Sequence, residues 1–115
     1  MDTSEAQISW QDFEKVNIAV GTIIKVEDFP KARKAAYKLT IDFGILGMRK
    51  SSAQITKLYN RESLIGRQVI AVINFPPKQI ADFMSGCLVL GAVEYNGSVT
   101  LLTVTHPVEN GTRIG

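Results

Sequence analysis

Histidine, cysteine and clustered acidic residues are scarce in this 115-residue chain, and their scarcity limits the chemistry open to it. His106 is the single histidine and Cys87 the single cysteine, so an internal disulfide is excluded. Catalytic dyads and metal sites need several such groups at close spacing, and no cluster of His, Cys, Asp or Glu has ligand spacing here. We therefore expect no metal, no cofactor and no enzymatic activity.

Phosphate-loop and membrane signals are missing as well. Neither G-x-x-x-x-G-K-[ST] nor G-x-G-x-x-G occurs, so nucleotide binding through a glycine-rich loop is not indicated. No apolar run approaches the roughly 20 residues that span a bilayer. The polar, acidic start Met1–Glu5 is the reverse of a secretory signal. Together with the single cysteine, it favours a cytoplasmic protein that does not insert into membranes.

Excess charge of one sign is also lacking. The 13 Lys and Arg residues are nearly balanced by 11 Asp and Glu residues, so the net charge is +2. A dedicated nucleic-acid binder usually carries more, so any such role needs a local basic patch. The length suits one domain, residues 1–115, with a core that pairing with a second copy would help to stabilise.

Alternating β-branched residues are the main structural signal that is present, and they predict strands. Gly21, in the middle of the first run, predicts a bend or bulge. Asn96-Gly97, between the last two runs, predicts a type I′ hairpin turn with positive φ at both central residues. These runs predict a sheet of about five strands. The six runs are Ile18–Val26, Tyr37–Phe43, Met48–Ala53, Gln68–Phe75, Leu88–Glu94 and Val99–Val104.

Helical signals are short. Ser9 and Asp12 have capping-box spacing, which predicts a helix over Trp10–Lys15. One or two helical turns are expected within Gln54–Gly66, and another over Lys78–Phe83. Residues 1–8 are expected to be frayed, and Thr105–Gly115 to be a tail. An all-β, five-stranded barrel with a helix between the third and fourth strands is the OB-fold pattern, and a small sandwich is the alternative.

Basic residues gather in three segments that an antiparallel barrel can bring to one side. Arg and Lys there would contact phosphates, while Ser, Asn and Gln would reach sugars or base edges. The alternative is a solvated charged rim, and interleaved acids such as Asp42 and Asp82 weaken the field. The cations are Lys31, Arg33, Lys34 and Lys38, then Arg49 and Lys50, then Lys78.

Several segments in order resemble CsaA-type proteins, which are stand-alone members of the tRNA-binding domain family and similar to the C-terminal domain of many bacterial methionyl-tRNA synthetases. The resemblance runs from about Asp12 to Gly115. Its most specific parts are S-S-A-Q-I-T and N-F-P-P. The segments are Asp12–Lys15, Val20–Ile23, Ser51–Thr56, Val72–Ile80, Ser85 and Leu88–Gly91.

The resemblance implies an OB-fold homodimer whose interface is built by the terminal segments 9–17 and 105–115. Trp10, Phe13, Val108 and Ile114 are the interface residues it suggests. The alternative is that Trp10 and Phe13 cover their own barrel. Asn17 and Ala19 depart from the family pattern, which commonly has an Asp and an Arg in this segment, so we expect no RNA contact there.

Two activities are implied by the resemblance: shape-directed tRNA binding, and export-related chaperone action on unfolded preproteins and translocation machinery. A generic single-stranded nucleic-acid binder is the alternative, and it would need exposed aromatic residues. Tyr37, Phe43 and Phe75 are instead expected in the core. The tRNA-binding residues that the family's binding face implies are Arg33, Arg49, Lys50, Ser52, Gln54, Asn74, Lys78 and Ser85.

Overall fold

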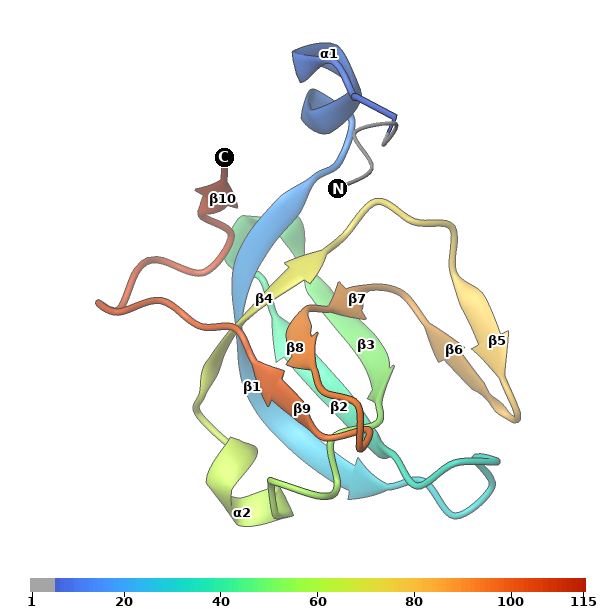
Figure 1. Cartoon of the computed structure of the whole chain (residues 1–115). Coiled ribbons are helices and arrows are strands. Elements are labelled where there is room, and N and C mark those ends of the chain that lie inside the picture. Colours follow the sequence, from blue (N-terminus) through green and yellow to red (C-terminus); the bar gives the residue numbers. More distant parts are fainter. Residues whose placement is uncertain (1–5) are drawn as a thin grey trace.

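The computed structural model describes residues 6–115, so the first five residues of the segment expected to be frayed lie outside the described part. Strands dominate the described residues (Figure 1). In chain order the elements are α1 (Trp10–Glu14), β1 (Ile18–Asp28), β2 (Tyr37–Asp42), a 3₁₀ turn η1 (Gly44–Leu46), β3 (Met48–Ala53), α2 (Arg61–Leu64), β4 (Gln68–Val72), β5 (Lys78–Ile80), β6 (Phe83–Ser85), β7 (Leu88–Val89), β8 (Gly91–Val93), β9 (Val99–Leu101) and β10 (Arg113–Ile114).

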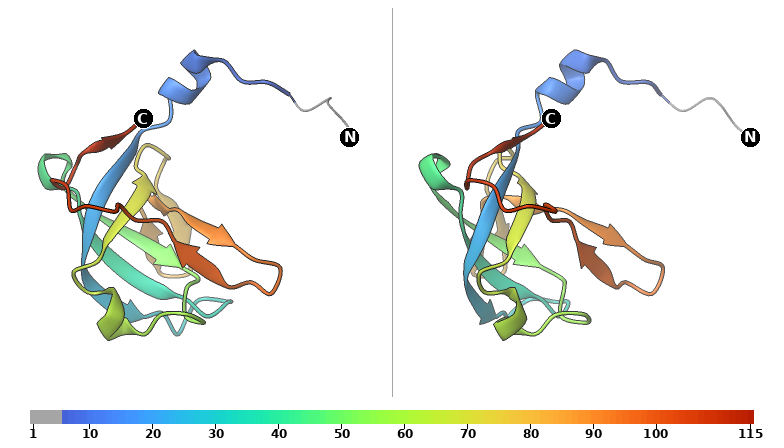
Figure 2. Two further views of the ribbon diagram at one scale, coloured as in Figure 1. Left: turned by 60° about the vertical axis from the view of Figure 1, so that its left-hand side comes forward. Right: turned by 90° about the vertical axis from the view of Figure 1, so that its left-hand side faces the viewer.

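The main sheet is antiparallel and curls into a nearly closed barrel. Its strand order is β3-β2-β1-β4-β7, and β10 pairs with the start of β1. The two ends of this order approach one another, because the Ser51 hydroxyl on β3 donates to the Cys87 carbonyl beside β7 at 3.1 Å. α2 lies between β3 and β4 and closes one end (Figures 1 and 2). The predicted five-stranded OB-fold barrel is confirmed.

The strand β1 carries a bulge, but not at the glycine where we expected it. The register with β2 runs from the Ile23–Ile41 pair to the Lys25–Thr40 pair, so the extra residue is Ile24. Gly21 serves close packing instead. A Cβ atom there would lie 2.6 Å from Ile41 Cγ2. The bulge lets one long strand bend and pair with β4 along its first half and with β2 along its second.

The barrel interior is filled by apolar side chains from every wall, as their alternation along the strands requires. A tyrosine pair ties the interior to the connecting segments. The Tyr37 hydroxyl donates to the Tyr59 carbonyl at 2.8 Å, and the Tyr59 hydroxyl accepts from the Leu101 amide at 3.0 Å. The largest fully buried apolar side chains are Phe43, Ile23, Leu39, Ile41, Leu64, Val20 and Val69.

The helix predicted over Trp10–Lys15 is confirmed as α1, which ends one residue earlier, and Ser9 and Asp12 form its capping box. The turn expected within Gln54–Gly66 is α2. The helical turn expected over Lys78–Phe83 is wrong, because this segment is the β5–β6 hairpin. Its strands are too short to show a period in sequence, and its two-residue turn places Ala81 at φ 52°. Phe83 then points into a second small core against Phe29.

The Asn-Gly hairpin is confirmed between β8 and β9, but its turn is not type I′. Within residues 6–115 Ala81 is the one non-glycine residue with positive φ, so Asn96 lacks the positive φ that a type I′ turn needs. Gly97 has φ 84°, and its amide donates to the Glu94 carbonyl at 2.9 Å. The loop is thus a type I turn followed by a left-handed glycine.

The expected tail is partly ordered into the sheet. Its end forms β10, with Ile114 opposite Ile18, and the Gly111 amide donates to the Val20 carbonyl at 2.7 Å. In the part of the chain that the structure describes, no helix is long and apolar enough to cross a membrane.

We predict that Gly21→Ala destabilises the barrel by about 1–3 kcal/mol, because the added methyl group would overpack Ile41 and Phe43. Urea denaturation measures the change in unfolding free energy. Gly86→Ala is the matched control, since a Cβ there would meet only the Lys50 carbonyl at 3.8 Å. Equal stability of both variants would show that the Gly21 contact tolerates a methyl group.

Candidate nucleic-acid interface

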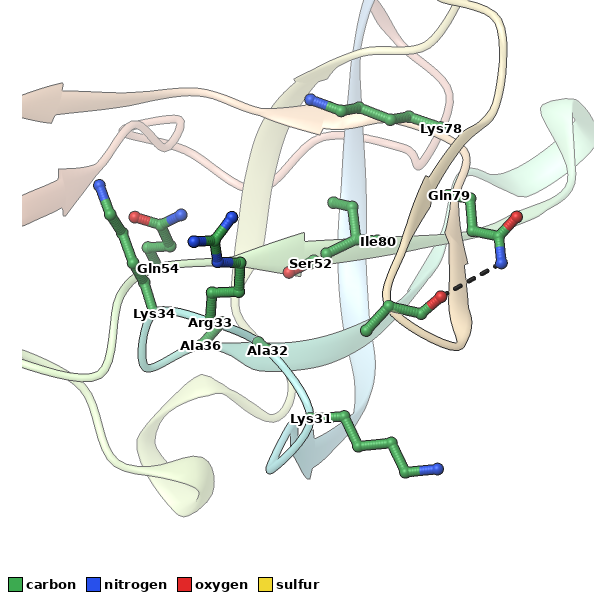
Figure 3. Close-up of a pocket in the computed structure, with 11 residues that line it drawn as sticks. Lys31, Ala32, Arg33, Lys34, Ala36, Ser52, Gln54, Lys78, Gln79 and Ile80 are labelled. Carbon is green, nitrogen blue, oxygen red and sulfur yellow. Dashed lines mark hydrogen bonds between the residues drawn. The ribbon is translucent and has the colours of Figure 1, made fainter.

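An open cleft of about 840 Å³ lies between the loop after β1, the end of β3 and the strand β5 (Figure 3). We call it the basic cleft. Arg33 and Lys34 come from the loop and lie beside Gln54, while Lys78 reaches in from β5 (Figure 3). Its lining residues are Lys31, Ala32, Arg33, Lys34, Ala36, Ser52, Gln54, Lys78, Gln79, Ile80 and Ala81.

A second small core holds two walls of this cleft together. The rings of Phe29, at the end of β1, and Phe83, on β6, lie with centroids 5.5 Å apart. The Lys38 ammonium group sits 4.9 Å from the Phe29 centroid and 5.6 Å from that of Phe83, within cation–π range of both. These contacts fix the β5–β6 hairpin opposite the loop, so the cleft has a defined width.

The charges of the cleft are unevenly compensated. Lys31 pairs with Asp82 at 3.2 Å, and this hydrogen bond lowers the pKa of the Asp82 carboxyl. Among residues 6–115, Arg33, Lys34 and Lys78 have no ion-pair partner. Three cations therefore face the cleft without a carboxylate to neutralise them, while the whole chain carries only +2.

The structure brings together four of the eight predicted RNA-contacting residues in the basic cleft: Arg33, Ser52, Gln54 and Lys78. Lys34 and Gln79 also line it and were absent from the predicted set. Lys34 belongs to the basic run that the sequence displays, so that signal could have found it. Gln79 was assigned to a helical turn, which hid its place on the cleft wall.

Arg49 and Lys50 lie in a second, neighbouring hollow of about 380 Å³. We call it the Phe75 hollow. Arg49 is half-buried, and its guanidinium donates to the Ile73 carbonyl at 2.9 Å, whereas Lys50 is exposed. The hollow is lined by Leu46, Met48, Arg49, Lys50, Phe75, Pro77, Met84 and Gly86.

Asn74 and Ser85 make internal hydrogen bonds. The Asn74 side-chain oxygen accepts from the Asn17 amide at 2.9 Å, and its nitrogen donates to the Lys15 carbonyl at 2.7 Å. The Ser85 hydroxyl donates to the Cys87 carbonyl at 3.2 Å. Asn74 thus joins the loop after β4 to the segment between α1 and β1.

The departure from the family pattern at Asn17 and Ala19 has a structural consequence at the C-terminal strand. The Asn17 side-chain oxygen accepts from the Arg113 guanidinium at 2.9 Å. Ala19 is buried and lies opposite Arg113 in the β1–β10 pair. A charge-assisted hydrogen bond from the Arg113 guanidinium to a neutral amide therefore stabilises the junction of the two termini, away from the residues that line the basic cleft.

The single cysteine is poorly suited to nucleophilic chemistry. Cys87 is buried, and burial raises the pKa of its thiol to about 11. The reactive thiolate is therefore scarce at neutral pH. Across residues 6–115, no group of three or more His, Cys, Asp or Glu side chains is placed to hold a metal ion.

The helix α1 stands away from the barrel (Figure 2). It contains no buried residue, and Trp10 is 83% exposed. The alternative in which Trp10 and Phe13 cover their own barrel is therefore wrong for Trp10, while Phe13 is half-buried. Of the other two residues suggested for an interface, Val108 is exposed and Ile114 is half-buried in β10.

Comparison with known proteins decides the family. The model of a family described as "Putative tRNA binding domain" matches residues 18–113. The chain belongs to the tRNA-binding domain family. The match covers β1 through the first residue of β10, which includes every residue that lines the basic cleft.

Two solved chaperones are similar to this family member over nearly its whole length. Chaperone CsaA from Bacillus anthracis is 50% identical with a TM-score of 0.92, covering 96% of this chain and 100% of that one. The CsaA chaperone protein from Picrophilus torridus is 52% identical with a TM-score of 0.88, covering 95% and 100%.

A methionine–tRNA ligase from Methanocaldococcus jannaschii is 32% identical over 108 residues, which is 94% of this chain but 16% of the ligase. The chain thus spans about one-sixth of the length of this curated relative. The similarity concerns one domain of the ligase, and the ligase's own activity does not follow from it.

Proposed function

We propose that this chain is a non-catalytic, cytoplasmic tRNA-binding protein and that the basic cleft is its tRNA-binding surface. The observation that carries the proposal is the grouping of Arg33, Lys34 and Lys78, without carboxylate partners among the described residues, around the polar side chains of Ser52 and Gln54. Membership of the tRNA-binding domain family supports the choice of ligand.

Each group in the cleft has a suitable role in such binding. The Arg33 guanidinium can hold a phosphate through two parallel hydrogen bonds, and the ammonium groups of Lys34 and Lys78 act as point charges. Ser52 and Gln54 offer a hydroxyl and an amide for the ribose 2′-hydroxyl or a base edge. Contacts of this kind recognise the shape of a folded RNA more than its sequence.

We predict that Arg33→Ala combined with Lys78→Ala lowers tRNA affinity and reduces the slope of log K against log salt by about one to two units. Each lost phosphate contact removes nearly one released counterion from binding. Fluorescence titration of folded tRNA across several salt concentrations measures both quantities.

Lys25→Ala combined with Arg61→Ala is the matched control for this pair. It removes the same charge, but Lys25 pairs with Glu27 and Arg61 with Asp28, and neither lines the basic cleft. We expect the control to keep most of the salt slope. An unchanged slope in the Arg33 and Lys78 variant would place the RNA on another surface, and absence of tRNA binding at low salt would reject the function itself.

We further propose that the chain is a homodimer joined through α1 and the C-terminal segment. Ile8 and Trp10 are strongly exposed on an arm whose helix contains no buried residue, although burial of such side chains is worth roughly 1.5–3 kcal/mol each. The hydrogen bonds of Arg113 to Asn17 and to the Glu14 carbonyl hold α1 and β10 together as one surface.

Trp10→Ala should shift the protein towards monomers, because it removes the largest apolar side chain of the arm. Sedimentation equilibrium at several protein concentrations measures the shift. Tyr95→Ala removes an even more exposed aromatic residue at the tip of the β8–β9 hairpin and should leave assembly unchanged. A Trp10→Ala protein that associates like the parent protein would contradict an interface at α1.

A second candidate function is capture of unfolded preprotein segments before their transfer to translocation machinery. Its support is the 50% identity to a solved chaperone CsaA, together with an apolar groove of about 360 Å³. This β7–β9 groove runs between the end of β3 and the hairpin, and Leu88 and Val93 are its most exposed apolar residues.

For this function, Val93→Ser should weaken binding of an unfolded secretory precursor by about tenfold, since it removes apolar area that the peptide would cover. Val93 is 74% exposed, so the fold should tolerate the change. Tyr95→Ser is the control, because Tyr95 lies on the same hairpin outside the groove. Equal affinity of the parent protein for folded and unfolded precursor, measured by titration, would reject the function.

A further inference from the structure

Phe75 is exposed on the surface, although its place after an apolar strand suggests a core residue. Its side chain is 55% exposed and forms part of the Phe75 hollow. Met48 and Met84, in the same hollow, are also more than half exposed, at 62% and 53%. Together the aromatic ring and the two thioether side chains give the hollow an apolar, polarisable lining that is more than half exposed.

The backbone holds Phe75 in this position from both sides. Asn74, directly before it, is anchored by its two hydrogen bonds to the Asn17 amide and the Lys15 carbonyl. Pro76, directly after it, restricts the Phe75 backbone to extended conformations, and Pro77 restricts the backbone of Pro76 in the same way. The ring is therefore presented before any ligand arrives, which lowers the entropy cost of binding.

The Phe75 hollow is positively charged and adjacent to the basic cleft. Its lining includes Arg49 and Lys50 and no carboxylate. Lys50 and Ser52 are two residues apart on β3, so their side chains leave the same face of the strand, and Ser52 lines the cleft. On the other side, Pro77 of the hollow is followed directly by Lys78 of the cleft.

We propose that Phe75 stacks on an unpaired nucleobase of the RNA that occupies the basic cleft. This rests on the proposed tRNA-binding function and adds to it a preference for RNA that offers a single-stranded position beside a folded region. The base would lie between Phe75 and the methionine side chains, while Lys50 and Lys78 hold the phosphates on either side of it. A basic hollow that adjoins a phosphate-binding cleft suits a nucleotide better than an apolar peptide segment.

Phe75→Leu tests the proposal, because leucine keeps apolar bulk and removes the aromatic face. We expect its affinity for folded tRNA to fall by about 5- to 100-fold, the range that stacking of one base supplies. The salt slope should stay unchanged, since no phosphate contact is lost, and Phe75→Trp should bind at least as tightly as the parent. Tyr95→Leu is the control and should bind normally.

A fully paired, blunt-ended RNA duplex is the second probe. Phe75→Leu and the parent protein should bind it with equal affinity, because it offers no unpaired base. Upfield shifts of the Phe75 ring protons on addition of tRNA, seen by NMR, would report stacking directly. They also separate stacking from any loss of fold in the variant.

The outcomes distinguish the stacking proposal from the proposal of tRNA binding on which it rests. If Phe75→Leu binds tRNA normally while the Arg33 and Lys78 variant binds weakly, the cleft is right and stacking is wrong. If the parent protein binds no RNA, both are wrong. If Phe75→Leu loses affinity only for an unfolded precursor, the hollow is a peptide site and stacking is rejected.

Discussion

The single long strand β1 is the constraint on which the rest of the structure depends. It pairs with β2, β4 and β10, so three ladders share one backbone. This is possible because the bulge at Ile24 bends the strand and because Gly21 lets Ile41 and Phe43 pack directly against its backbone. Both ends of β1 then position the surfaces proposed for binding. Its first residues hold α1 beside β10, and its last residues lead to Phe29, where the loop of the basic cleft begins.

The cleft depends on a core outside the barrel. The β5–β6 hairpin does not belong to the main sheet, and Phe83 is the residue that buries against Phe29. Lys38 adds cation–π contacts to both rings, and Lys31 pairs with Asp82 across the same gap. Lys31 and Lys38 thus stabilise the walls of the cleft. Arg33, Lys34 and Lys78 remain available to a ligand. Counting cations in the sequence does not separate these two groups of basic residues. The difference depends on where the two aromatic rings and the Asp82 carboxylate lie in the structure.

The sequence predicted the features that depend on local chemistry. The capping box of α1, the strands up to β4 and the Asn-Gly hairpin each follow from neighbouring residues, and each is confirmed. The turn type at Asn96-Gly97 is a local error, and the larger errors arise where contacts between distant residues determine the structure. Lys78–Phe83 is a hairpin because Phe83 finds Phe29, and β10 forms because β1 offers a free edge there. Phe75 is held at the surface next to Asn74, whose side chain binds the backbone of Lys15 and Asn17 just before β1. These hydrogen bonds span 59 and 57 residues, so no local pattern shows them.

The surfaces proposed for RNA and for unfolded polypeptide share one wall. Ser52 and Gln54 line both the basic cleft and the β7–β9 groove, because the end of β3 lies between them. A ligand that fills one surface therefore contacts residues that the other ligand also needs. By linkage, any effect of RNA on peptide affinity must equal the effect of peptide on RNA affinity. We therefore expect the two proposed activities to be coupled through the end of β3, whose position is set by its ladder with β2.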